Sequence, residues 1–196
     1  MKKFVYLASQ SPRRRQLLDQ IGVSYELLLA TPEEDAESLE TIRPGELPMT
    51  YVKRVTQLKL EAAVQRMKAR RLTTAPVLCA DTTVALGRQI LGKPEDAKDA
   101  FRILKALSGQ THRVLTAVAV ASGRKRQIRV AVSQVTFAPM KISDIKRYIE
   151  SGEPMGKAGA YGIQGLAAAY ISEIKGSYTG IMGLPLFETS EILKSI

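Results

Sequence analysis

Three consecutive arginines at the start of a predicted helix constrain this chain more than any other feature. Residues 4–8 form a short apolar run that is typical of a buried strand. Ser11 then has a side chain suited to an N-cap, and Pro12 fits the first helical position, where its missing N–H costs nothing. Arginines 13–15 follow at once. The sequence therefore predicts a strand, a tight turn and a helix whose first turn is strongly basic.

The place of these arginines predicts an anion-binding site. A helix N-terminus already carries partial positive charge, so cations there are unfavourable unless an anion lies in front of them. Free backbone N–H groups, the hydroxyls of Ser9 and Ser11 and the guanidinium groups would together bind phosphate. The alternative interpretation is three solvated arginines on a surface helix.

Composition sets the broad class of protein. The 196 residues include 29 Lys and Arg against 19 Asp and Glu, so the net charge is +10 and anionic partners are favoured. No apolar run is long enough to span a bilayer, and the first apolar segment is too short for a signal peptide. Cys79 is the only cysteine, which excludes an internal disulfide. We expect one domain over residues 1–196, in the cytoplasm and without a membrane partner.

Apolar runs and longer periodic segments alternate along the chain, which indicates an α/β fold. Strands are predicted at residues 4–8, 25–29, 77–80, 112–121, 127–137 and 166–174. Helices are predicted at residues 12–21, 50–67, 94–107, 143–150 and 185–193, with Ser143 as the cap of the fourth. The two longest strands form a hairpin around Gly123, so the sheet is at least partly antiparallel.

Three single residues are candidates for chemistry. Asp81 follows the apolar strand 77–80, and α/β folds often place catalytic or metal-binding groups at a strand end; capping a turn is the alternative. Lys59 lies close to the apolar stripe of its helix, where a snorkelling lysine is the alternative. His112 is the only histidine, so acid–base chemistry is expected from carboxylates.

Residues 87–93, GRQILGK, match the first seven positions of a P-loop. Pro94 stands where that motif needs a hydroxyl for Mg²⁺, and no strand and helix flank the stretch in the required way. We therefore predict that this segment is not a P-loop.

Six short motifs follow one another along nearly the whole chain. They are ASQSPRR at 8–14, ADT at 80–82, GKP at 92–94, SGQTH at 108–112, KAGAYGIQG at 157–165 and GLP at 183–185. Together they resemble the Maf family of nucleoside triphosphate pyrophosphatases, also known as septum-formation inhibitors. The resemblance implies a long mixed β-sheet flanked by helices with a central cleft, similar to inosine triphosphate pyrophosphatases. It also implies hydrolysis of a nucleoside triphosphate to the monophosphate and pyrophosphate, assisted by a divalent metal cation, Mg²⁺ or Mn²⁺.

The resemblance further implies roles for individual residues. Asp81 would be the proton acceptor, and Glu34 and Asp81 would hold the metal. The residues that would bind phosphate are Ser9, Arg14, Lys59 and Lys93. In the branch that acts on dTTP and UTP, base choice would depend on Arg13, Thr82 and Gln164. The family commonly has aspartate before the lysine of the last long motif, where this chain has Gly156.

If Gln164 meets the base, as the resemblance implies, its side-chain chemistry predicts which bases are accepted. Its amide offers a donor and an acceptor, which suits a pyrimidine edge with N3–H beside carbonyl oxygens; cytosine would mismatch unless the amide flipped. A purine would be too large for a pocket lined by Ala160, Gly162 and Gly165. The alternative is that Gln164 only ties down its glycine-rich loop. We predict that dTTP and UTP are good substrates and that CTP, ATP and GTP are poor ones.

Other functions stay open at this point. The sister branch of the family acts on 7-methyl-GTP, a nucleic-acid-binding regulator would exploit the charge of +10, and a cell-division factor would need no intact Asp81. The basic clusters at 68–71 and 124–126 are typical of solvated surface, so no specific nucleic-acid partner is expected. A homodimer is compatible with the sequence.

Overall fold

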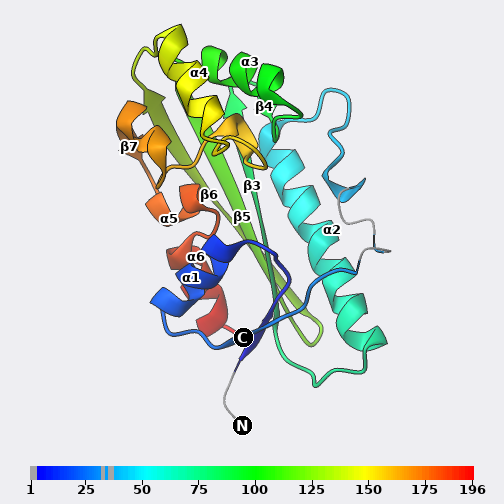
Figure 1. The fold of residues 1–196 in the computed structure, drawn as a ribbon. Helices are drawn as coiled ribbons and strands as arrows, with labels where there is room; N and C mark the ends of the chain where they lie inside the picture. Colours follow the sequence, from blue (N-terminus) through cyan, green and yellow to red (C-terminus); the bar gives the residue numbers. More distant parts are fainter. Residues whose placement is uncertain (1–3, 32–33, 35–37) are drawn as a thin grey trace.

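The computed structural model describes residues 4–31, 34 and 38–196. Its centre is a seven-stranded mixed sheet of order β2-β1-β3-β5-β6-β7, with β4 paired to β3 (Figure 1). The strands are β1 (Val5–Leu7), β2 (Tyr25–Leu27), β3 (Val77–Leu86), β4 (Gln89–Leu91), β5 (Thr111–Ser122), β6 (Lys125–Phe137) and β7 (Ile171–Lys175). The predicted mixed α/β class is confirmed.

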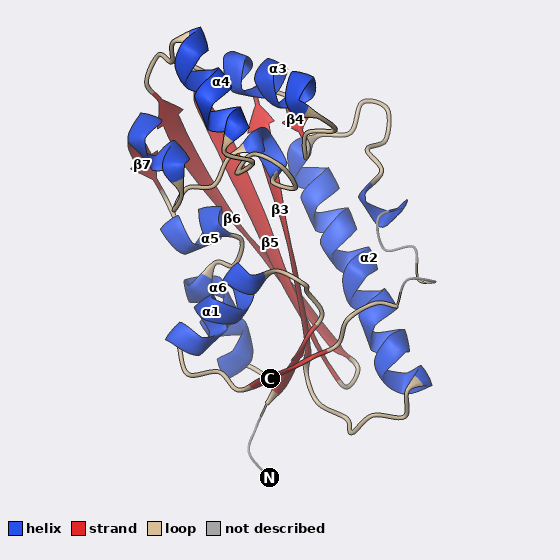
Figure 2. Ribbon diagram, viewed as in Figure 1, coloured by secondary structure: helices blue, strands red, loops and turns tan. Residues whose placement is uncertain are grey.

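Helices flank the sheet (Figure 2). They are α1 (Pro12–Gln20), α2 (Pro48–Ala69), α3 (Ala97–Leu107), α4 (Ile142–Glu150), α5 (Tyr178–Met182) and α6 (Leu186–Lys194). Of these, α3 and α4 cover the end of the long strands that lies away from the two chain termini (Figure 2). Short 3-10 helices are η1 (Ser38–Glu40), η2 (Ala158–Ala160) and η3 (Leu166–Tyr170). No helix among the described residues has both the length and the apolarity needed to cross a membrane.

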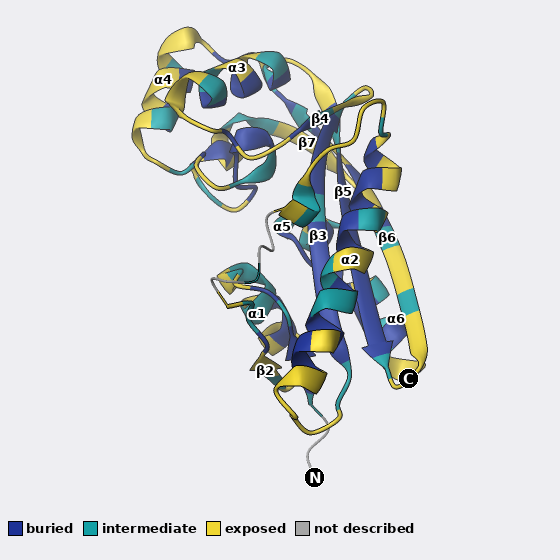
Figure 3. Cartoon of the chain, turned by 90° about the vertical axis from the view of Figure 1, so that its right-hand side faces the viewer, coloured by how far each residue is buried: buried dark blue, intermediate teal, exposed yellow. Residues whose placement is uncertain are grey.

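The side chains of β3 alternate between two cores, because successive residues of a strand point to opposite faces. Val77 and Cys79 pack with the apolar side of α2. Leu78 and Ala80 pack with α1 and α6 on the other face. Figure 3 shows the resulting pattern, with β3 buried and the outer surface of α2 exposed.

One edge of β3 is open in the middle of the strand. β1 pairs in parallel with β3 only at Val77 and Leu78, and β4 pairs in antiparallel fashion from Val84 to Leu86. Between them, at residues 79–83, no described strand pairs on this edge, whereas β5 runs along the whole opposite edge. The middle of β3 therefore has a neighbouring strand on one edge only.

The placement of Asp81 at a strand end was wrong. β3 continues to Leu86, so Asp81 lies in the middle of the strand and pairs with Ala117 of β5. The β-branched residues Thr82, Thr83 and Val84 favour continued strand. Asp81 is nevertheless reachable, because it lies at the open edge.

Two further segments differ from the prediction. The N-cap of α4 is Lys141, without a side-chain hydrogen bond, so Ser143 is inside the helix and does not cap it. The predicted strand 166–174 begins as η3, and β7 starts only at Ile171, which agrees with the poor strand propensity of the alanines at 167–169. Residues 87–88 form the β3–β4 turn, residues 89–91 form β4 and residues 92–93 follow it, so the turn does not lead into a helix and the rejection of a P-loop is confirmed.

Candidate active site

A cleft of about 780 Å³ lies at the open edge of β3, within the range typical of small-molecule sites. The β1–α1 turn forms one wall, and residues 155–164 form the wall opposite. All nine site residues predicted from the sequence line this cleft: Ser9, Arg13, Arg14, Glu34, Lys59, Asp81, Thr82, Lys93 and Gln164. The tertiary fold thus brings together residues spread over more than 150 positions of the chain.

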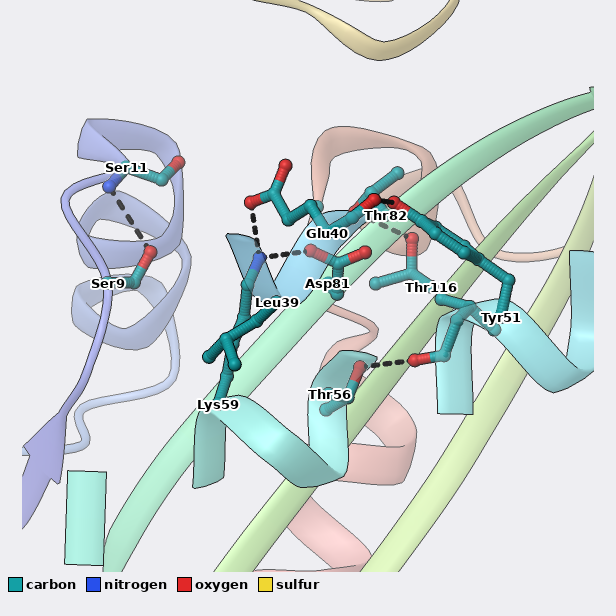
Figure 4. A network of polar contacts seen from close by, with 12 residues as sticks. Ser9, Ser11, Leu39, Glu40, Tyr51, Thr56, Lys59, Asp81, Thr82 and Thr116 are labelled. Carbon is teal, nitrogen blue, oxygen red and sulfur yellow. Dashed lines mark hydrogen bonds and ion pairs between the residues drawn. The ribbon is translucent and has the colours of Figure 1, made fainter. Parts of the chain in front are cut away.

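Four charged side chains form a continuous ionic chain in the cleft, and Figure 4 shows three of them, Asp81, Lys59 and Glu40. Lys59 of α2 donates to Asp81 Oδ1 at 2.6 Å and to Glu40 Oε1 at 2.7 Å. Lys93 donates to the second oxygen of Glu40 at 2.9 Å. The order is therefore Asp81, Lys59, Glu40, Lys93. Lys59 is no snorkelling surface residue, because its amine points into the cleft and bridges two carboxylates.

Electrostatics in this ionic chain favour the charged forms. Burial acts to lower the pKa of Lys59, but the charges of Asp81 and Glu40 outweigh it and raise the pKa above its usual value. Burial acts to raise the pKa of Glu40, but Lys59 and Lys93 outweigh it and lower that pKa. Lys59 and Glu40 are therefore both stabilised in their charged forms.

Glu40 is a functional candidate that reasoning from the sequence missed. It ends η1, in a polar loop where no periodicity separates it from its neighbours. Two residues of α2 fix this loop: the hydroxyl of Tyr51 donates to the main-chain oxygen of Glu40 at 2.9 Å, and Arg54 donates to that of Thr41 at 2.9 Å. Arg54 also holds Glu46 through two hydrogen bonds of 2.6 and 2.7 Å. Only the contacts with a distant helix identify Glu40.

Glu34 lies on the cleft wall in a different set of contacts. The guanidinium of Arg66 donates to both carboxylate oxygens of Glu34, with the closest approach at 2.6 Å, and Arg70 is 3.5 Å away. The hydrogen bonds from Arg66 are the main reason that the pKa of Glu34 is lowered. Glu34 is thus bound by arginines, whereas Glu40 shares a lysine with Asp81.

The basic turn has the predicted strand–turn–helix form. Ser11 is the N-cap of α1 and accepts from the Arg14 N–H. The Arg14 side chain donates to the main-chain oxygen of Gly183 at 2.8 Å and to Ser9 Oγ at 3.0 Å. Ser9 Oγ also accepts from the Ser11 N–H at 3.2 Å, so its own proton stays available for a ligand. Of the three arginines, Arg13 and Arg14 line the cleft.

Arg13 and Lys157 are two cations that line the same cleft and act on each other electrostatically. The Nε atom of Arg13 is buried and has no hydrogen-bond partner among the described residues. Lys157 donates only to the main-chain oxygen of Glu153 within the described chain. Burial lowers the pKa of Lys157, and the charge of Arg13 lowers it further. This end of the cleft therefore favours an electron-rich group, and Lys157 is a second residue that the sequence did not single out for a role.

The loop that carries Gln164 is held by other residues. Tyr161 shares a hydrogen bond of 2.8 Å with the buried His112. Glu153 accepts from the hydroxyl of Tyr148 at 2.7 Å and from the Leu166 N–H at 2.9 Å. The amide of Gln164 is exposed and has no hydrogen bond within the described chain. The interpretation that Gln164 only ties down the loop finds no support here.

The predicted lining of the pocket by three small residues was wrong at two positions. Gly162 lines the cleft. Ala160 is fully buried in the core, and a Cβ at Gly165 would lie 2.3 Å from the Glu153 carboxylate. Gly165 therefore makes room for an internal carboxylate rather than for a ligand.

Thr82 takes part in a neutral network on the other face of β3 (Figure 4). Its hydroxyl lies 3.0 Å from that of Thr116, its partner in the β3–β5 register. The Thr116 hydroxyl donates to the main-chain oxygen of Gly180 in α5 at 2.6 Å. Thr82 is thus connected to α5, while Asp81 is connected to α2.

Comparison with known proteins places this cleft in a family. The family described as "Maf-like protein" matches residues 4–196. A dTTP/UTP pyrophosphatase of Albidiferax ferrireducens is 63% identical over 195 residues, covering 100% of this chain and 98% of the relative. A dTTP/UTP pyrophosphatase of Cupriavidus pinatubonensis is 60% identical, covering 99% and 97%.

The fold also matches a solved structure of distant sequence. A HAM1 protein from Coxiella burnetii superimposes with a TM-score of 0.52 at 14% identity, covering 99% of this chain and 100% of that one. At this identity the match concerns the fold alone.

Proposed function

Because the chain belongs to the Maf-like protein family, we propose that it hydrolyses nucleoside triphosphates, dTTP and UTP above all, to the monophosphate and pyrophosphate. The observation that carries the proposal is the ionic chain of Asp81, Lys59, Glu40 and Lys93 in a cleft of nucleotide size. The relatives that share about 60% of their residues with this chain are dTTP/UTP pyrophosphatases, which supports the substrate class.

Four predicted residues suit the triphosphate. Lys59 and Lys93 are cations whose present partner, Glu40, is an anion that phosphate oxygens can replace. Arg14 stands at the N-terminus of α1, where backbone N–H groups add positive potential. Ser9 has a proton to donate. Together they would hold the phosphates and stabilise charge that develops on the leaving pyrophosphate.

Asp81 is the proposed general base. Lys59 binds its Oδ1 atom, which fixes the carboxylate in place and leaves Oδ2 to accept a proton from water. The water oxygen then bonds to the α-phosphorus, the bond from that phosphorus to the bridging oxygen breaks, and pyrophosphate leaves with the electron pair.

The residues present fit a divalent cation that is shared with the substrate. No group of three or more acidic, histidine or cysteine side chains in the described part of the chain could hold an ion by itself. Mg²⁺ is commonly held by one or two carboxylates together with substrate phosphates and water. Asp81 and Glu40 would supply those carboxylates, whereas Glu34, the ligand that the resemblance implies, is held by Arg66. When bound, the cation would neutralise phosphate charge.

A nucleotide panel tests the proposal. The purified protein is incubated with dTTP, UTP, CTP, ATP, GTP and 7-methyl-GTP, with Mg²⁺ or Mn²⁺, and pyrophosphate release is measured. We expect kcat/KM for dTTP and UTP to exceed that for CTP by about 5- to 150-fold, which corresponds to the cost of about 1–3 kcal/mol for one unpaired polar group in the complex. A preference for 7-methyl-GTP would assign the chain to the sister branch, and no turnover of any nucleotide would favour a non-enzymatic role.

We further propose a cytoplasmic location with the nucleotide as the partner of the cleft. A homodimer stays a prediction.

A further inference from the structure

The neutral network at Thr82 has a fixed direction. A carbonyl oxygen can only accept, so the Thr116 hydroxyl must use its single proton in the 2.6 Å bond to Gly180. The 3.0 Å bond between Thr82 and Thr116 then needs a proton from Thr82. Thr82 consequently has no proton left, and it meets a ligand with lone pairs only.

Thr116 is held firmly enough to impose this direction. It is 1% exposed and lies directly opposite Thr82 in the antiparallel ladder. Its acceptor, Gly180, has little room to move: its N–H bonds to Ser177 Oγ at 3.0 Å, and a Cβ there would lie 3.1 Å from the same side chain. Releasing Thr116 would leave a buried hydroxyl or carbonyl unpaired, which is costly.

We propose that Thr116 is a positioning residue for base selection, which acts by fixing Thr82 as a hydrogen-bond acceptor. An acceptor at the base edge matches the N3–H of uracil and thymine. Cytosine has an unprotonated N3, and two acceptors facing each other leave both unpaired. The inference rests on the proposed function, because it assumes that Thr82 meets the base.

Thr116 supplies what Gln164 cannot. The amide of Gln164 can exchange donor and acceptor by rotation, so it adapts to either pyrimidine at little cost. The Thr82 hydroxyl can also rotate by itself, but bonding to Thr116 commits its proton. Rejection of cytosine should therefore depend more on the buried Thr116 than on the exposed Gln164.

The test compares Thr116→Val, Thr116→Ser and the control Thr111→Val. Thr111 also lies on β5 and pairs its hydroxyl across strands, with Thr136 at 2.9 Å, but it is exposed and outside the cleft. Values of kcat and KM are measured for UTP and CTP. Thr116→Val frees the Thr82 proton, so the UTP/CTP ratio of kcat/KM should fall about 10-fold, mainly through KM. Thr116→Ser should restore the ratio, and Thr111→Val should leave it unchanged.

An unchanged UTP/CTP ratio of kcat/KM in folded Thr116→Val would overturn the proposal, whether both activities stay the same or fall equally. If Thr116→Val does not fold, Thr82→Val tests the same acceptor: UTP should lose about 10-fold in kcat/KM and CTP should lose nothing. Equal losses there would also overturn it. Calorimetry with UMP and CMP separates the two proposals, because binding needs no turnover. If the protein hydrolysed no nucleotide but bound UMP more tightly than CMP, and if Thr116→Val removed this preference, the proposed function would be wrong and the role of Thr116 would stand.

Discussion

Asp81 and Thr82 are neighbours in the chain, yet the two faces of β3 on which they lie are built on different principles. On the α2 face, Asp81 belongs to a chain of ion pairs with Lys59, Glu40 and Lys93. On the α5 face, Thr82 belongs to a chain of neutral hydroxyl groups that ends on a main-chain oxygen. Both reach the same cleft because the edge of β3 is open between them.

The difference shows how one strand can serve two tasks. Solvent-exposed ion pairs exchange partners readily. The Lys93 side chain is half exposed, so an arriving phosphate can replace Glu40 as its partner. A buried hydroxyl chain has no alternative partner and keeps its direction. The ionic face suits a substrate whose charge changes during reaction, and the neutral face suits recognition of a base that does not react.

The largest expected effect separates the two faces directly. Asp81→Asn removes the proposed general base and should lower kcat by about 10²-fold or more, while the preference for UMP over CMP in binding stays unchanged. Steady-state kinetics and calorimetry measure the two effects, with Asp144→Asn of α4 as the control. Loss of base preference in Asp81→Asn would show that the faces are not independent.

As the pH falls, folding stability should be lost first through His112, on the neutral side, and only in stronger acid through the glutamates of the ionic side. Burial lowers the pKa of His112 to about 4, so between pH 6.5 and pH 4 the unfolded chain binds a proton that the folded one does not. Stability is therefore lost as pH falls through this window, by about 2 kcal/mol between pH 7.5 and pH 5. The lowered pKa values of Glu34 and Glu40 act only in stronger acid.

Urea unfolding at pH 7.5 and pH 5 checks this, and His112→Gln should remove the difference. Since His112 is the only histidine, no second imidazole can mask the result. The same pH dependence in His112→Gln would contradict the expectation.

A matched pair of variants distinguishes the two glutamates of the ionic side. Glu40→Gln should raise the Mg²⁺ concentration needed for half-maximal activity about 10-fold, because a carboxylate beside the phosphates is lost. Glu34→Gln should leave that concentration unchanged and lower the melting temperature, because it breaks the pair with Arg66. The reverse pattern would restore Glu34 as the metal ligand.

The smallest effect is expected at the rim of the neutral side. Gln164→Ala should reduce the UTP/CTP ratio of kcat/KM by at most about 5-fold, since its amide adapts to either base. Its melting temperature should equal that of the unchanged protein. A clear drop in melting temperature would instead support the interpretation that Gln164 holds its loop.

The sequence alone was enough for most local elements and for nine residues of the site. Apolar periodicity located α2 and the β5–β6 hairpin, and the N-cap and proline signals located α1, since each depends on neighbours within a few residues. The family resemblance named nine residues, and all nine line one cleft.

Only the tertiary structure decided which hydrogen bonds and ion pairs those residues make. Glu40 had no local signal, and the motif that begins at Lys157 gave that lysine no role, because the importance of both comes from Lys59, Lys93 and Arg13, which lie far away in the chain. The open edge that exposes Asp81 arises where β1 leaves β3 and β4 has not yet joined it. The direction of the Thr82 hydrogen bond is set by Gly180, nearly one hundred positions away. The donor in a bond between two hydroxyls can be assigned only when all the other hydrogen-bond partners of both groups are known.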